Sequence, residues 1–121
     1  MSIGARRAEL AEAISEALDD VRVHPYKTSS PAPFTGWLQI EQTDTEACTF
    51  GEVRLTVECQ ILVAASRPDF EMVQDTLAAP LIAAINAAGG RAVVVQPFTE
   101  TVGSTTLYAL SARFVTESEV A

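Results

Sequence analysis

The stretch GEVRLTVECQILVAASRPDFEMVQDTL, residues 51–77, constrains the fold more than any other part of the chain. Apolar side chains recur at every second position, at Val53, Leu55, Val57, Cys59, Ile61 and Val63. Polar side chains fill the positions around them, at Glu52, Arg54, Thr56, Glu58 and Gln60. A period of two predicts one strand with a buried face and a wet face, roughly 36 Å long at about 3.3 Å per residue. Such a strand needs a second layer of structure on its apolar side.

Helices are predicted on both sides of this strand in the sequence. Residues 3–18 form an amphipathic opening helix with Arg6 on its polar side and apolar residues at helical spacing, namely Ile3, Leu10, Ile14 and Leu18. After the strand, Ser66 fits a helix N-cap and Pro68 fits the first turn. Pro80 lacks the backbone N–H that a helix interior requires. We therefore predict two helical pieces there, at about residues 69–78 and about residues 80–88.

Shorter strands account for most of the remaining chain. They are predicted at residues 21–26, 37–43, 92–98 and 105–116, with loops at residues 27–36, 44–51 and 99–104. Neighbouring strands joined by short loops favour antiparallel pairing, and the helices must cover one sheet face to bury their apolar stripes. The predicted fold class is therefore α+β: a mostly antiparallel β-sheet with its helices packed on one face. A chain of 121 residues fits a single domain, residues 1–121.

The charge of the chain limits its partners. Eight Lys and Arg residues against sixteen Asp and Glu residues give a net charge of −8. An acidic surface does not attract a nucleic-acid backbone or an anionic membrane. No apolar run approaches the roughly 20 residues that span a bilayer, and the start MSIGARRAEL lacks the apolar segment of a secretion signal. We expect a protein that is made and kept in the cytosol, with no membrane partner.

The two cysteines, Cys48 and Cys59, are expected to stay reduced. If the segments on either side of Phe50 form a hairpin, Cys59 lies near Ile40 while Cys48 lies at the turn. That separation is too large for a disulfide. The expected arrangement is one thiol in a loop and one in the core, in line with cytosolic redox conditions.

No catalytic group stands out in the sequence. The single histidine, His24, has no Cys or acidic residue at metal-ligand spacing, and Ser29 and Ser30 have no nucleophile motif around them. The chain has no phosphate-binding glycine motif, and the acids at residues 44–46 lack the spacing of a calcium loop. We therefore predict that the protein is not an enzyme, and that it has no catalytic, cofactor-binding or metal-ligating residues.

Four of the few aromatic residues, Phe34, Trp37, Phe50 and Phe98, lie in or beside predicted loops. For each of them alone, packing back onto the core is the ordinary expectation. Together they favour a protein contact surface, because aromatic anchors are enriched where proteins meet. Thr99 and Glu100, from the predicted loop at residues 99–104, are assigned to the same interface.

The order of the predicted elements follows a recognisable layout. An amphipathic opening helix is followed by a Pro-rich loop leading into GWLQIE, a long alternating strand ending ILVAAS, the segment RPDFEMVQDTLAAPLIAAINAAGG, and a closing strand LYALSARFVT. This layout resembles the tail terminator proteins of long-tailed bacteriophages, and the length of the chain also fits. The resemblance covers nearly all of the chain. It rests on layout, because that family has no catalytic motif to match.

The resemblance implies a structural virion protein that forms a six-fold ring on the head-proximal end of a finished tail tube. Such a ring ends tube polymerisation and joins the tail to the neck proteins below the capsid. Its partners are then copies of itself, the tail tube protein and the neck proteins, while genomic DNA only passes through the lumen. Tube or neck contacts are expected on the loops around Phe34 and Phe50 and on residues 99–104. We assign Glu52 and Glu58 to an acidic lumen that lets DNA slide.

Two other classes of protein fit the same sequence. Another head-to-tail neck subunit, such as a head-completion or adaptor protein, shares the size, the acidity and the lack of catalytic motifs. A small cellular α+β module that binds a ligand as a dimer is a more distant alternative, and a pocket lined by Tyr26, Trp37 and Tyr108 would favour it. An enzyme would require His24 within hydrogen-bond reach of a carboxylate and a nucleophile.

Overall fold

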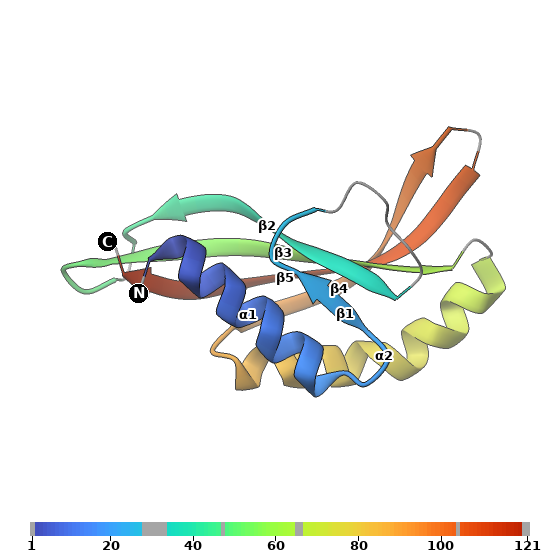
Figure 1. Cartoon of the computed structure of the whole chain (residues 1–121), viewed down its shortest axis with the longest axis horizontal. Helices are drawn as coiled ribbons and strands as arrows, with labels where there is room; N and C mark the ends of the chain where they lie inside the picture. Colours follow the sequence, from blue (N-terminus) through green and yellow to red (C-terminus); the bar gives the residue numbers. More distant parts are fainter. Residues whose placement is uncertain (1, 28–33, 47, 65–66, 104, 120–121) are drawn as a thin grey trace.

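The computed structural model describes residues 2–27, 34–46, 48–64, 67–103 and 105–119. This part of the chain forms α1 (Ile3–Ala17), β1 (Arg22–His24), β2 (Thr35–Asp44), β3 (Glu52–Ala64), α2 (Arg67–Ala87), β4 (Arg91–Val102) and β5 (Thr105–Glu119). The strands form one sheet in the order β1-β2-β3-β5-β4, and both helices pack on the same face of it (Figure 1). We call that face the inner face and the opposite one the outer face.

The sheet is antiparallel except at one edge. β2 pairs with β3, β3 with β5, and β5 with β4, all in antiparallel fashion. The short strand β1 pairs with β2 in parallel. This arrangement confirms the predicted α+β class with a mostly antiparallel sheet and helices on one face. The final strand, β5, is inserted between β3 and β4, so it has a neighbour on both sides.

The long alternating strand is β3, and its apolar side chains form the centre of the core. Leu55, Val57, Cys59 and Ile61 are all buried on the inner face. They belong to one cluster with side chains from both helices and from β5, including Leu10, Ile14, Leu81, Ile85, Leu110 and Phe114. Burying a side chain of this size contributes about 1.5–3 kcal/mol. The helices therefore supply the second layer that the alternating pattern demands.

A single helix, α2, replaces the two helical pieces predicted from the sequence. It runs from Arg67 to Ala87 with Pro80 inside it. Its apolar stripe continues past the proline on the inner face, through Phe70, Val73, Leu77, Leu81 and Ile85. Pro80 itself is exposed. A proline in a helix interior costs about 3 kcal/mol, and burial of the stripe on both sides of it offsets that loss.

The last two strands are longer than predicted, so the expected loop at residues 99–104 was wrong. β4 extends to Val102 and β5 runs to Glu119. Thr99 pairs with Tyr108, the ladder continues as far as Val102 and Thr105, and these paired ends of β4 and β5 tilt away from the body of the sheet (Figure 1). Threonine and valine favour strands, and Gly103 at φ +64° supplies the turn.

Arg6 ties the first turn of α1 to the ends of α2 and β5, although the sequence placed it on the polar side of its helix. Its Nη2 donates to the Ala88 carbonyl at 2.8 Å and to Thr116 Oγ1 at 2.7 Å, and its Nη1 pairs with Glu9. A cation is favourable at the C-terminal end of a helix. The buried Thr116 hydroxyl also donates to the Gly89 carbonyl at 3.3 Å. Segments far apart in the sequence are thus joined at one end of the molecule.

Cys48 and Cys59 are both free thiols, as predicted. Cys59 is buried in β3, whereas Cys48 lies in the connection between β2 and β3. The register differs from the prediction, because Cys59 lies opposite Leu38, and Ile40 lies opposite Val57. The pairing is shifted by two residues, which is one full period of a strand, so Cys59 still points to the face that was expected.

We expect neither thiol to react quickly in the folded protein. Burial raises the pKa of Cys59 to about 12, and burial followed by the charge of Glu117 raises the pKa of Cys48 above its ordinary value. Because the thiolate is the nucleophile, iodoacetamide at pH 8 should modify Cys48 more slowly than in the unfolded chain, and Cys59 only after unfolding. Mass spectrometry of timed samples measures both rates. Fast modification of Cys59 in the native protein would contradict its position in the core.

Candidate functional site

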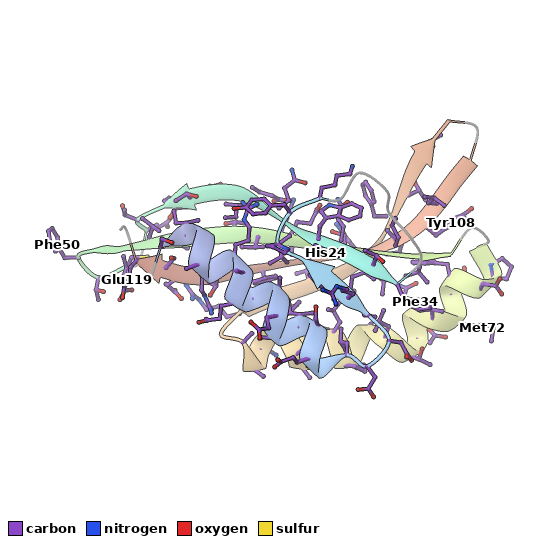
Figure 2. The ribbon with its side chains drawn as sticks, in the orientation of Figure 1. His24, Phe34, Phe50, Met72, Tyr108 and Glu119 are labelled. Carbon is purple, nitrogen blue, oxygen red and sulfur yellow. The ribbon has the colours of Figure 1, made fainter. Side chains whose placement is uncertain are left out.

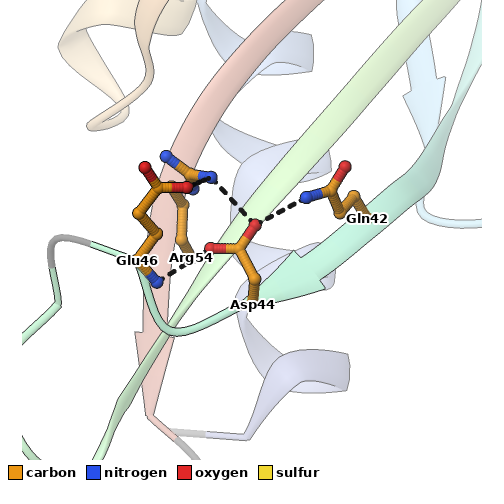
Figure 3. A network of polar contacts seen from close by, with 4 residues as sticks. All are labelled: Gln42, Asp44, Glu46 and Arg54. Atoms are coloured by element: carbon orange, nitrogen blue, oxygen red, sulfur yellow. Dashed lines mark hydrogen bonds and ion pairs between the residues drawn. The ribbon is translucent and has the colours of Figure 1, made fainter.

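A polar network lies on the outer face where β2 ends (Figure 3). Arg54 Nη2 lies 2.9 Å from Asp44 Oδ2 and 2.9 Å from Glu46 Oε2. Gln42 donates to Asp44 Oδ2 at 2.8 Å, and the Glu46 backbone N–H donates to Asp44 Oδ1 at 2.9 Å. Asp44 lies opposite Arg54 in the β2–β3 register, so strand pairing brings the two charges together. The network holds the start of the connection that leads to Phe50.

The arginines of the outer face are matched by nearby carboxylates. The hydrogen bond from Arg54 holds the pKa of Asp44 below its ordinary value, and the Glu46 amide acts in the same direction. The same side-chain bond raises the pKa of Arg54. Arg113 Nη2 lies 2.8 Å from Glu41 Oε2, and this bond raises the pKa of Arg113. The positive charges of Arg54 and Arg113 are thus paired with carboxylates of the same chain.

Arg54→Met is expected to lower the stability of the protein at pH 7 and to lose that effect in acid. The folded-state pKa of Asp44 is depressed, so its ionised form contributes stability above the unfolded pKa. As the pH falls through the depressed folded pKa, that contribution disappears. Urea unfolding of both proteins at pH 7 and at about pH 2 measures the difference, with Arg54→Lys as the charge-conserving control. An equal difference at both pH values would contradict the role of this pair.

Glu52 and Glu58, the residues assigned to a channel, both belong to β3. They alternate with its buried side chains, so the strand period places them on the outer face. Glu58 lies opposite Arg113 and accepts a hydrogen bond from Gln60. Glu52 begins the strand and lies opposite Glu119. The two acids therefore have different surroundings, and their assignment to a channel stays a prediction.

Phe50 is the most exposed of the predicted aromatic residues. It lies at the tip of the connection between β2 and β3, at one end of the long axis of the molecule (Figure 2), and its side chain is fully exposed. Gly51, at φ +89°, forms the turn beside it. Leaving a phenylalanine in water forgoes roughly 1.5–3 kcal/mol of burial. The core of a single copy gains nothing from this side chain.

Phe34 and Phe98 are partly exposed and lie away from Phe50. Phe34 precedes β2 at φ +61°, donates its backbone N–H to the Leu62 carbonyl at 2.7 Å, and lies toward the opposite end of the molecule (Figure 2). Phe98 lies on the outer face of β4, opposite Ala109, with 38% of its surface exposed. The predicted aromatic residues therefore do not form one continuous patch.

Trp37 is buried rather than exposed, so the structure does not place it on a contact surface. Only 1% of its surface is exposed, and it packs with Leu62, Ala109 and Leu107 in a small cluster on the outer face. The Lys27 ammonium lies 5.2 Å from the centre of its ring. The reason is that β2 begins at Thr35, earlier than predicted, which brings the indole into the sheet and away from the loop.

Thr99 and Glu100 lie in β4 and not in a loop. Thr99 is exposed and pairs with Tyr108, while Glu100 pairs with Leu107. The side chain of Glu100 lies outside the described part of the chain. Both residues are on the edge strand of the sheet, and their assignment to an interface stays a prediction.

His24 shares a groove of about 420 Å³ with residues of α1 that include Glu12, Ser15 and Glu16. The hydroxyl of Ser15 is already engaged, because its Oγ accepts from the Val23 N–H at 2.8 Å and donates to the Val23 carbonyl at 3.1 Å. Among the described residues, no hydrogen bond joins His24 to Ser15 or to either carboxylate. A hydrolytic site needs a nucleophile, a base and an orienting acid in contact, and the structure shows no such contacts among the described residues of this groove.

The three aromatic residues of the alternative ligand pocket do not converge. Tyr108 packs against Phe70, with ring centroids 5.8 Å apart, and belongs to the inner-face core. Trp37 lies in the separate outer-face cluster. Tyr26 is exposed and holds the Arg7 guanidinium 4.3 Å from its ring centre. This arrangement removes the observation that would have favoured a small ligand-binding module.

Sequence reasoning missed two exposed apolar residues. Val94, on the outer face of β4, is 56% exposed, and Met72, on α2, is 71% exposed at the end of the molecule away from Phe50 (Figure 2). Val94 lies in a run of three valines that reads as a buried strand. Its exposure follows from the position of β4 at the edge of the sheet, which local pattern does not reveal.

Comparison with protein-family models found no match for this chain, and a search of curated proteins found none either. Within the described part of the chain, no helix is long and apolar enough to cross a membrane. The same residues contain no group of three or more His, Cys, Asp or Glu side chains that could hold a metal ion. The candidate site is a set of surfaces, namely the exposed Phe50 tip and the outer face of the sheet with the β4 edge, where Val94 and Phe98 are exposed.

Proposed function

We propose that this chain is a structural subunit that assembles with copies of itself into a ring and caps the head-proximal end of a bacteriophage tail tube. The ring ends tube polymerisation and joins the tail to the neck proteins. The subunit is made in the cytoplasm of the bacterial host and then becomes part of the virion. The proposal starts from the layout that the sequence shares with tail terminator proteins.

The observation that carries the proposal is the full exposure of Phe50. A phenylalanine at the tip of a hairpin, on a chain with a net charge of −8, has no packing role within its own subunit. Aromatic side chains that fill pockets of a partner dominate many protein interfaces. The Phe50 tip is then the anchor that contacts the tail tube, and the network around Asp44 and Arg54 holds its base in place.

The outer face of the sheet fits the wall of a passage for DNA. Glu52 and Glu58 recur on it along β3, and its arginines are paired with carboxylates of the same chain. A ring of such subunits repels the phosphate backbone and does not bind it, because like charges repel across a narrow channel. DNA passes through such a lumen without sequence-specific contact.

The experiment that tests the function combines purified protein with tail tubes that lack a cap. Light scattering gives the mass of the free protein, and electron microscopy of the mixture shows where it binds. We expect rings in solution, or density at one end of each tube. A monomer or dimer that ignores tubes would contradict the proposal.

A different neck subunit is the second candidate, and the same exposed Phe50 favours it equally. The two functions differ in the partner that the protein binds first. A terminator binds the tube before heads are present, whereas a head-completion or adaptor protein binds filled heads and leaves free tubes unchanged. Mixing the protein separately with tubes and with tail-less heads therefore distinguishes them.

A further inference from the structure

The two edges of the sheet differ in whether they can accept another strand. At the β1 edge, Ser15 of α1 bonds both the N–H and the carbonyl of Val23, at 2.8 Å and 3.1 Å. β1 is also only three residues long, from Arg22 to His24. A short strand whose backbone groups are already bonded is a poor template for pairing. This edge is closed by α1.

The β4 edge is open. β4 is twelve residues long, and among the described strands only β5 pairs with it, so its other edge has no neighbouring strand. Pro97 lies within it, and an edge strand accommodates proline where the nitrogen faces away from the neighbouring strand. Because backbone direction repeats every two residues along a strand, the backbone N–H and C=O groups of Val95 and Thr99 face the same open edge as the nitrogen of Pro97. An extended chain placed there finds donors and acceptors.

The composition of β4 fits contact with another acidic chain. Between Arg91 and Glu100 the strand carries no charged residue. On its outer face it exposes Val94, at 56%, and Phe98, at 38%. Exposed edges are commonly protected by charged side chains, lysine above all, and this stretch has none. Two copies that each carry a charge of −8 meet here without strong repulsion.

β2 supplies a second, complementary edge in the same chain. β1 covers β2 only at residues 35–37, so residues 38–44 have no neighbour on that side among the described strands. The pairing order makes β4 run in the direction opposite to β2. If the ring axis runs roughly along the strands, rotation from one copy to the next leaves the direction of β2 nearly unchanged. That strand then arrives antiparallel to β4 of the first copy.

We propose that residues 93–99 of β4 pair with residues 38–44 of β2 in the next copy, so that the sheets of successive copies join edge to edge. This inference rests on the proposed ring and names the contact that builds it. The contact is heterologous, because it uses a different surface on each of the two copies. The same contact therefore repeats from copy to copy. It gives a closed ring when the rotations between successive copies bring the last copy into contact with the first.

Cysteine cross-linking tests the contact. Val94 and Gln42 are exposed on the outer face, one at each proposed edge. Val94→Cys and Gln42→Cys are placed together in a Cys48→Ser chain, and a second chain combines Gln96→Cys with Gln42→Cys to cover the adjacent register. Mild oxidation of the assembled protein should give a ladder of covalent oligomers on a denaturing gel. A mixture of the two single variants should stop at dimers.

Each competing arrangement gives a different result. Dimers from Val94→Cys alone would show two-fold pairing of β4 with β4 and overturn the proposed contact. Rings that yield no ladder from either double variant would also overturn it, while leaving the proposed function intact. A chain that neither assembles nor caps tubes would overturn both.

Hydrogen exchange followed by mass spectrometry gives a readout that needs no added cysteine. Assembly of the wild-type protein should slow exchange in peptides that cover residues 93–99 and 38–44 by about tenfold or more, because their outward amides gain partners. Peptides that cover β1, whose edge Ser15 already closes, serve as the internal control and should not change. Equal protection of β1 and β4 would argue against an edge contact at β4.

Discussion

Phe50→Ser should weaken capping of tail tubes by about 30-fold or more and leave the subunit as stable as the wild type. Phe50 is fully exposed, so its removal leaves no cavity in the folded chain. Truncating an aromatic anchor at the centre of an interface costs about 2 kcal/mol or more, and that energy corresponds to about a 30-fold change in affinity. Substitutions at exposed positions change the free energy of unfolding by about 0.5 kcal/mol or less.

Co-sedimentation with tubes measures the first effect, and urea unfolding measures the second. Phe50→Tyr keeps the ring and should keep most of the binding. Met72→Ser is the matched control, because Met72 is also exposed but lies at the other end of the molecule (Figure 2). If Phe50→Ser caps tubes normally and fails to join heads, the Phe50 tip contacts the neck. If it does both normally, the tip is not an interface.

Trp37→Ala should have the opposite signature, with a loss of about 3–5 kcal/mol in the free energy of unfolding. Trp37 is 1% exposed and packs against Leu62, Ala109 and Leu107 on the outer face. Removing the indole takes away those contacts and leaves a cavity, and the measured cost depends on how far the cluster collapses. A loss of this size is a large fraction of the roughly 5–15 kcal/mol by which whole domains are stable.

Urea unfolding followed by circular dichroism measures this loss, because the variant has no tryptophan left to report by fluorescence. Trp37→Phe keeps most of the apolar volume and should cost clearly less. A Trp37→Ala protein that is as stable as the wild type but no longer assembles would overturn the placement of the indole inside the sheet and return it to the contact surface.

The layers of the fold follow from local patterns. The alternation along β3 predicts which of its side chains are buried, and the helical spacing of Leu10 and Ile14 predicts the face that α1 presents. Both patterns depend only on which way successive side chains point from a helix or a strand. That direction is set by the local backbone conformation and does not depend on distant contacts. The class of fold could therefore be predicted from the sequence.

The errors come from contacts between distant segments. Pro80 signals a break, yet α2 continues through it because the sheet holds the stripe on both sides. Residues 99–102 look like a loop, yet β5 supplies them with partners. Trp37 and Phe50 both stand beside loop-like sequence, and only the pairing of β2 shows that the first is buried and the second exposed. Surfaces for assembly are weakly specified by pattern for the same reason.

The insertion of β5 between β3 and β4 has a consequence for biosynthesis. β5 follows every other described strand in the chain, and its partners on both sides leave the ribosome before it does. Because translation proceeds at about 5–20 residues per second, the backbone edges of β3 and β4 that pair with β5 stay unpaired for seconds. The hydrogen bond from Arg6 to Thr116 also cannot form before then, because Thr116 belongs to β5. The nascent chain therefore exposes unpaired strand edges to aggregation and chaperone binding until β5 emerges, and the described sheet is completed only after translation of residues 105–119.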